Sequence, residues 1–151
     1  MPNDQLKIQL LREELELLRR AAETLIQSVN KCIVILQQDE YTFENMESFD
    51  SLTSKFGRCA DLYTQKVLRT IWMLLHEPFV PFIDTLNKAE KMKIIQSADQ
   101  LLEIRDLRNQ ITHEYIPDAI TELVPEVISN SKFLIENIEF TREFLKKRNW
   151  E

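Results

Sequence analysis

The chain has 151 residues with a formal net charge of −6, one glycine, five prolines, 44% hydrophobic and 29% charged residues. This length suits a single domain over residues 1–151, and the composition favours long helices over a turn-rich β fold. A single glycine excludes a glycine-rich phosphate loop, two cysteines indicate buried reduced thiols, and no Cys/His cluster has the spacing of metal ligands. No signal peptide or membrane-spanning run is visible, so we expect a cytoplasmic protein without cofactors.

The first predicted helix spans residues 5–37. Its apolar residues alternate in steps of four and three, the spacing of a heptad seam: Leu11, Leu15, Leu18, Ala22, Leu25, Val29, Cys32 and Leu36. Such a seam can pack within a bundle or form a coiled-coil dimer, and packing within the bundle is the favoured interpretation. Residues 37–50 break the period and hold five acids and no basic residue. This predicts a solvated connector, with a contact to a basic partner surface as the alternative.

The second predicted helix begins at an N-cap formed by Ser48 or Asp50 and ends near His76. Gly57 lowers helix propensity within it. A close approach of another helix is the favoured reason for this glycine, and a ligand contact is the alternative. The next loop holds two prolines and two phenylalanines, which predicts a connection packed onto the bundle.

The remaining elements are a short helix, a motif helix and a C-terminal helical region. The short helix is predicted to begin at residue 84 or 85 and to end near Lys91. After Pro117 we expect a short helical turn, a kink at Pro125 and a helix over residues 125–147. A basic tail, residues 142–151, could fray. The pattern as a whole predicts an all-α antiparallel bundle of about four to five helices.

The motif helix carries the most informative stretch, residues 101–115, which reads LLEIRDLRNQITHEY. Ser97 and Gln100 form a capping-box pattern before it, and Pro117 stops it. An apolar stripe would face the core: Leu101, Ile104, Leu107 and Ile111. A separate face would carry Arg105, Arg108, Asn109, Thr112 and His113. This polar face is the candidate site, because it lies apart from the stripe that packs.

Arg108 and His113 suit phosphodiester cleavage without a metal. A neutral imidazole can take a proton from a ribose 2′-hydroxyl, and an imidazolium can give one to the leaving oxygen. A guanidinium can stabilise the charge that builds on the phosphate, and Asn109 can orient the phosphate or the imidazole. On one straight helix, however, residues five apart point about 140° apart and lie about 7.5 Å apart along the axis. The two side chains could act on one small group only if the helix is distorted or if a second copy, crossing at a two-fold axis, supplies the partner.

The segment RNQITHEY resembles the Arg-polar-x3-His signature of the HEPN superfamily, in the Arg-x4-His-x-Tyr form of HepT-like toxins. Residues 48–147, about two thirds of the chain, resemble bacterial HepT-like proteins. The resemblance implies a helical domain that dimerises through the motif helix and acts as a metal-independent endoribonuclease of a type VII-like toxin–antitoxin system. By position, Arg108 and His113 would be catalytic, with Asn109 as the polar neighbour. Tyr115 would be the residue to which a minimal nucleotidyltransferase antitoxin adds AMP.

Two functions are compatible with the motif face and the resemblance. The first is an endoribonuclease toxin with RNA as substrate, in which Arg105 and Thr112 would help to bind the RNA. The second is a non-catalytic helical partner or nucleotide-binding subunit of a nucleotidyltransferase. The net charge of −6 is unfavourable for general phosphate attraction, so a nuclease would need a local positive groove.

Overall fold

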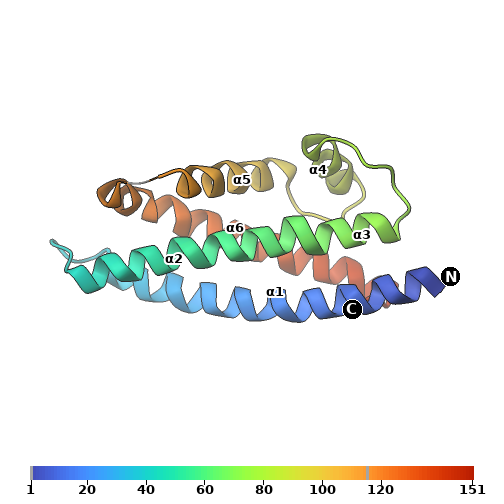
Figure 1. Cartoon of the computed structure of the whole chain (residues 1–151), viewed down its shortest axis with the longest axis horizontal. Coiled ribbons are helices and arrows are strands. Elements are labelled where there is room, and N and C mark those ends of the chain that lie inside the picture. Colours follow the sequence, from blue (N-terminus) through green and yellow to red (C-terminus); the bar gives the residue numbers. More distant parts are fainter. Residues whose placement is uncertain (1, 115) are drawn as a thin grey trace.

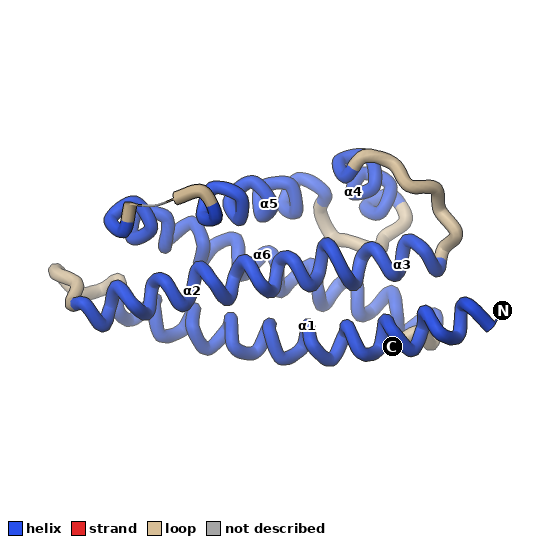
Figure 2. Tube along the Cα trace, viewed as in Figure 1, coloured by secondary structure: helices blue, strands red, loops and turns tan. Residues whose placement is uncertain are grey.

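The computed structural model describes residues 2–114 and 116–151, and their regular structure is entirely helical (Figures 1 and 2). Five helical rods follow one another along the chain. They are α1 (Pro2–Ile35); a continuous rod made of α2 (Phe43–Asp61), the π-helical segment η1 (Leu62–Val67) and α3 (Leu68–Leu74); α4 (Phe82–Lys91); α5 (Ala98–Thr112); and α6 (Pro117–Arg148). The all-α prediction is confirmed. No helix in the described ranges is both long and apolar enough to cross a membrane.

The seam of α1 packs within the bundle. Leu11, Leu15, Leu18, Leu25 and Cys32 are buried, and α1 contacts the α2–α3 rod and α6. The other seam residues (Ala22, Val29 and Leu36) are partly buried against the same core. The favoured interpretation of the seam therefore agrees with the structure. Both cysteines are free and buried, as their places in the pattern predicted.

The start of α2 differs from the prediction. The helix begins at Phe43, and Thr42 is its N-cap. The Thr42 hydroxyl accepts from the Asn45 backbone N–H (3.1 Å), and the Asn45 side chain accepts from the Thr42 N–H (2.9 Å). This capping box satisfies two backbone donors at once, so caps at Ser48 or Asp50 were wrong. Residues 43–50 are helical rather than a connector, and Phe49 is fully buried.

The α2–α3 rod ends at Leu74, two residues before the predicted end. His76 lies beyond it with a positive φ of 56°, and its Nε2 lies 3.3 Å from the Asp4 carboxylate. The loop after it is only partly packed, because Phe79 is 72% exposed. The Trp72 indole N–H donates to the Pro78 carbonyl (3.1 Å) and fixes the start of this loop.

The C-terminal region is one helix, α6, with Pro125 inside it. The predicted short turn and the helix after it are parts of this one element, and the first turns of α6 run in another direction than the rest (Figure 1), in agreement with the predicted kink. Its inward residues include those predicted: Val127, Leu134, Ile138, Thr141 and Leu145. The chain then packs back on α1, where the Arg12 guanidinium donates to the Glu151 backbone carbonyl (3.1 Å).

Candidate functional site

A buried polar cluster holds the N-terminal end of α5. Ser97 is the N-cap, and its hydroxyl accepts from the Gln100 N–H (3.2 Å). In the predicted capping box the Gln100 side chain would accept from the Ser97 backbone N–H. Instead, the Asn137 side-chain oxygen of α6 accepts from the Gln96 and Ser97 N–H groups (3.0 and 3.1 Å). The Asn137 amide donates to the Gln100 side chain (2.9 Å). These bonds satisfy donors that a helix start leaves free.

A second set of bonds joins this cluster to η1. The Tyr63 hydroxyl is fully buried and lies 2.6 Å from the Thr141 hydroxyl, which donates to the Ile94 carbonyl (2.7 Å). Burial raises the pKa of Tyr63 well above its ordinary value of 10.0, although the bond to Thr141 opposes this. The position of α5 is thus fixed by side chains of the core.

The two faces of α5 separate as predicted. Leu101, Ile104 and Leu107 are buried and Ile111 is partly buried, whereas the arginine, amide and imidazole side chains lie outside the core. The helix ends at Thr112, however, and His113 is its C-cap with φ −96° and ψ 3°. The prediction of helix through residue 115 was therefore wrong at its end. The His113 side chain is exposed beyond the last turn.

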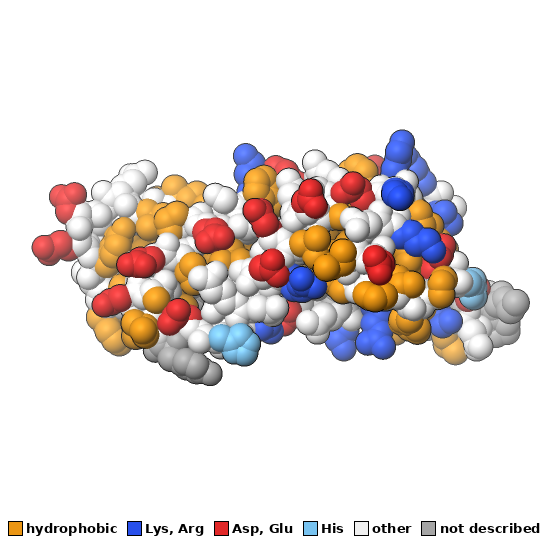
Figure 3. Space-filling model, turned by 90° about the horizontal axis from the view of Figure 1, so that it is seen from above, with side chains coloured by type: hydrophobic (Ala, Val, Ile, Leu, Met, Phe, Trp, Pro, Cys, Tyr) orange, Lys and Arg blue, Asp and Glu red, His pale blue; other side chains and the backbone are white. Residues whose placement is uncertain are grey.

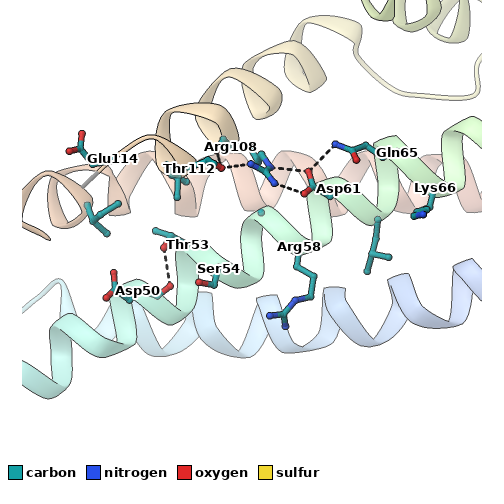
Figure 4. Close-up of a pocket in the computed structure, with 14 residues that line it drawn as sticks. Asp50, Thr53, Ser54, Arg58, Asp61, Gln65, Lys66, Arg108, Thr112 and Glu114 are labelled. Atoms are coloured by element: carbon teal, nitrogen blue, oxygen red, sulfur yellow. Dashed lines mark hydrogen bonds and ion pairs between the residues drawn. The ribbon is translucent and has the colours of Figure 1, made fainter. Parts of the chain in front are cut away.

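Arg108 is bound by a residue that the sequence did not identify, Asp61 at the end of α2. Its Nε donates to Oδ1 (2.9 Å) and its Nη2 to Oδ2 (2.6 Å), which is a two-pronged pair. The remaining amino group donates to the Thr112 hydroxyl one turn later. These side chains point toward one another across α2 and α5 (Figure 4). The hydrogen bonds that Arg108 donates to Asp61 raise the pKa of Arg108. The two side chains are 29% and 32% exposed.

A groove of about 770 Å³ lies beside this pair, between α2 and the end of α5. Its walls carry charges of both signs: Asp50, Asp61 and Glu114, with Arg58, Lys66 and Arg108. Gly57 also lines it. A Cβ added at Gly57 would lie 3.9 Å from Arg108 Cγ, an ordinary contact, so the interpretation of this glycine as a close helix approach was wrong.

The other predicted residues lie apart from this groove. Arg105 and Asn109 line a smaller cavity of about 240 Å³ on the opposite side of the pair, together with Asp61. The Arg105 guanidinium lies over the Phe82 ring at 5.3 Å. The structure therefore brings Arg108 and Thr112 together and leaves His113 exposed on its own. No local pattern in the sequence pointed to Asp61, because its pairing with Arg108, 47 residues later, depends on how α2 and α5 pack.

The charge around the end of α5 is mixed. Figure 3 shows acidic and apolar side chains at this end of the bundle, while Lys and Arg lie nearer the middle and the other end. Tyr115, the predicted site of AMP addition, lies outside the described residues. Within the described ranges no group of His, Cys, Asp and Glu could hold a metal ion.

Comparison with known proteins gives no family for this chain. No family model matches the sequence, and no curated protein matches it. The function therefore has to be inferred from the residues and their geometry.

Proposed function

We propose that the protein is a metal-independent endoribonuclease whose active site forms across two copies of the chain. The observation that carries this proposal is the end of α5, where Arg108 is held by Asp61 and His113 is exposed beyond the last helical turn. Neither residue contributes to the core. An arginine fixed at a groove can stabilise charge on a phosphate, and an exposed imidazole can transfer the protons of metal-independent phosphodiester cleavage.

In this reaction the ribose 2′-oxygen attacks the adjacent phosphorus. The neutral His113 imidazole of one copy accepts the 2′-hydroxyl proton, and the His113 imidazolium of the other copy gives a proton to the departing 5′-oxygen. The products are a 2′,3′-cyclic phosphate and a free 5′-hydroxyl. Arg108 stabilises the extra negative charge on the phosphate oxygens, and Asp61 keeps the guanidinium in one orientation. Asn109 orients the phosphate or the imidazole, and Arg105 and Thr112 help to bind the RNA.

Silencing by a minimal nucleotidyltransferase antitoxin follows from the same proposal. The Tyr115 hydroxyl oxygen would attack the α-phosphorus of ATP, lose its proton to solvent and release pyrophosphate. Tyr115 is two residues from His113, so the added phosphate would place negative charge beside the imidazole and fill space that RNA needs. In an HEPN-like dimer formed through α5, each copy would carry its own Tyr115 near its own His113, so AMP could be added to both copies.

A second function, the non-catalytic partner, is favoured by a different observation. The Arg108 charge is already neutralised by Asp61, and the groove also holds Asp50 and Glu114. A surface of this kind suits a protein partner with charges of both signs better than it suits a bare phosphate. This function predicts a stable complex with a nucleotidyltransferase and no cleavage of RNA.

Cleavage of bulk tRNA in EDTA by the purified protein tests the proposal. Arg108→Ala and His113→Ala should each abolish the cyclic-phosphate products, while the matched exposed variants Arg20→Ala and His76→Ala should cleave like the unchanged protein. Circular dichroism and sedimentation check that all variants keep their helicity and oligomeric state. Phosphodiesterase treatment beforehand removes any AMP on Tyr115.

A mixing experiment tests whether the site is shared. Unchanged chains that exchange with an excess of His113→Ala chains should lose cleavage as mixed dimers form, because a mixed dimer holds only one of the two His113 imidazoles that the reaction uses. Sites contained within one chain would instead keep the activity of the unchanged chains. Equal cleavage by all variants would reveal a contaminating nuclease. Absence of cleavage by the unchanged protein would favour the partner function.

A further inference from the structure

A second cavity lies between α3, α4 and the loop that joins them, and it shares Gln65 and Lys66 with the Arg108 groove. Its volume is about 460 Å³, within the range of about 300–1,000 Å³ typical of small-molecule sites. Six apolar side chains form its floor, and each is at most 8% exposed: Leu68, Ile71, Trp72, Leu86, Ala89 and Ile94. We call this cavity the apolar pocket.

Two cations stand at the rim of the apolar pocket. Lys66 and Arg69 line it and are exposed, and neither is paired with a carboxylate in the described parts of the chain. No acidic side chain is among its described lining residues. The Arg69 guanidinium lies over the exposed Phe79 ring, 5.8 Å from its centroid. The rim is therefore positive, although the chain as a whole carries a net charge of −6.

The wall of the apolar pocket includes irregular helix. Thr64, Gln65 and Lys66 line it, and all three belong to the π-helical segment η1. Such segments are rare and often occur at functional sites. On the other side, the Trp72–Pro78 bond ties the start of the loop that carries Phe79 and Val80.

We propose that the apolar pocket binds a small amphipathic carboxylate, such as a medium-chain fatty acid. The chain of the ligand would lie on the buried apolar floor, where it loses contact with water. Its carboxylate would accept two hydrogen bonds from the Arg69 guanidinium and would form an ion pair with Lys66. A neutral molecule of the same shape would gain the burial of its apolar chain but not the contacts with Arg69 and Lys66. Gln65 and Lys66 also line the Arg108 groove, but no residue of the apolar pocket is given a role in RNA cleavage, so ligand binding is tested separately from the nuclease proposal.

Titration with decanoate, below its micelle concentration, tests the proposal. Trp72 is a direct reporter because it lines the pocket, and Trp150→Phe removes the signal of the other tryptophan while keeping an aromatic ring beside Phe144. The fluorescence emission of Trp72 should change as decanoate is added and should reach a plateau. The titration should fit one binding site per chain. Decanol should bind at least about tenfold more weakly, because a charge-assisted contact contributes that much or more.

Two variants locate the ligand. The double variant Lys66→Gln with Arg69→Gln should raise the Kd of decanoate about tenfold or more and leave the Kd of decanol unchanged. The matched double variant Lys132→Gln with Lys147→Gln loses the same charge from exposed positions and should bind decanoate normally. Ala89→Leu should weaken both ligands by filling the floor, with circular dichroism as the check on folding.

Three results would overturn the proposal. They are no saturable binding of decanoate, equal Kd values for decanoate and decanol, and equal weakening of decanoate by the rim and the matched double variants. The rim variants change exposed side chains only, so they decide the question even if Ala89→Leu does not fold.

Discussion

The two ends of α5 are held in opposite ways. At the N-terminal end, Asn137 binds the backbone of residues 96 and 97 inside the protein, and Tyr63 and Thr141 extend this buried cluster. At the C-terminal end the ion pair of Arg108 with Asp61 joins α5 to α2 at a partly exposed position. Beyond it, His113 is exposed. Polar groups in the core therefore position the helix, and polar groups at its open end are available to other molecules.

The buried polar residues at one end of α5 and the exposed polar residues at the other end should contribute differently to the free energy of unfolding. A buried amide leaves its partners unsatisfied when it is removed, which costs far more than the bond itself contributes. An exposed ion pair or imidazole contributes little to stability. Substitutions at the two ends should accordingly affect different measurements, stability at one end and activity at the other.

The largest loss of stability is expected for Asn137→Ala. It removes one acceptor that serves two backbone N–H groups and one donor to Gln100, so we expect a loss of about 3 kcal/mol in the free energy of unfolding. Urea denaturation followed by circular dichroism measures this. Asn87→Ala, at an exposed helical position, is the control and should change stability by less than about 0.5 kcal/mol. Equal losses in both variants would contradict a structural role for the buried cluster.

Alkaline pH should weaken the buried region selectively. Burial raises the pKa of Cys59 from 9.0 to about 12 and raises that of Tyr63 above its ordinary value of 10.0. Between the unfolded and folded pKa values only the unfolded chain loses the proton, so the free energy of unfolding is unaffected below pH 9. It should fall as the pH rises above 9, and faster above 10, by up to about 1.4 kcal/mol per pH unit for each group.

Tyr63→Phe and Cys59→Ala separate the two contributions. The pH dependence of the free energy of unfolding, measured from pH 8 to 11, should lose its steeper part above 10 in Tyr63→Phe. The part that begins near pH 9 should become smaller in Cys59→Ala and disappear only when Cys32 is replaced too, because burial also raises the pKa of the Cys32 thiol. A slope that neither variant changes would place the sensitive group elsewhere.

A smaller loss in the free energy of unfolding is expected for Asp61→Asn. The amide keeps one acceptor for Arg108 but loses the charge and the two-pronged geometry, and the pair is about one third exposed. We expect a loss of about 0.5–1 kcal/mol in stability together with a larger fall in RNA cleavage, because the guanidinium is no longer fixed. Asp106→Asn, an exposed acid on α5, is the control for both measurements. Unchanged cleavage in Asp61→Asn would show that Asp61 does not position Arg108 for catalysis.

The smallest effect on stability is expected for His113→Ala. The side chain is exposed beyond the end of α5, so the free energy of unfolding should change by less than about 0.5 kcal/mol. The melting temperature and the circular dichroism spectrum measure this. A loss above about 1 kcal/mol would assign the imidazole a structural role that its exposure does not indicate.

The sequence predicted the helical architecture because hydrophobic periodicity reports directly on burial. The steps of four and three in α1 identified its packed side, and the stripe at Leu101, Ile104 and Leu107 separated the core side of α5 from the motif face. Boundaries were less accurate. The first turns of α2 were missed because the capping box uses Asn45, whereas the usual pattern has Glu or Gln at that position.

The candidate site was predictable only within one helix. The face that carries Arg108 and Thr112 followed from the spacing, but Asp61 is 47 residues away from Arg108. A pairing of this kind depends on how two helices pack, and no local pattern encodes it. The end of α5 at Thr112, which changes the direction of His113 relative to Arg108, also depends on context rather than propensity, since the residues up to Glu114 continue a helical pattern.

The place of the two chain ends in the bundle has a practical consequence. The last residues fold back on α1 through Arg12, and Figure 1 places the N- and C-termini at the end of the bundle opposite to the end of α5. An affinity tag, a fluorophore or a surface tether attached at either terminus would therefore leave residues 112–114 facing solution. Immobilised protein would present this end to RNA, to a nucleotidyltransferase or to another copy of itself without interference from the attachment.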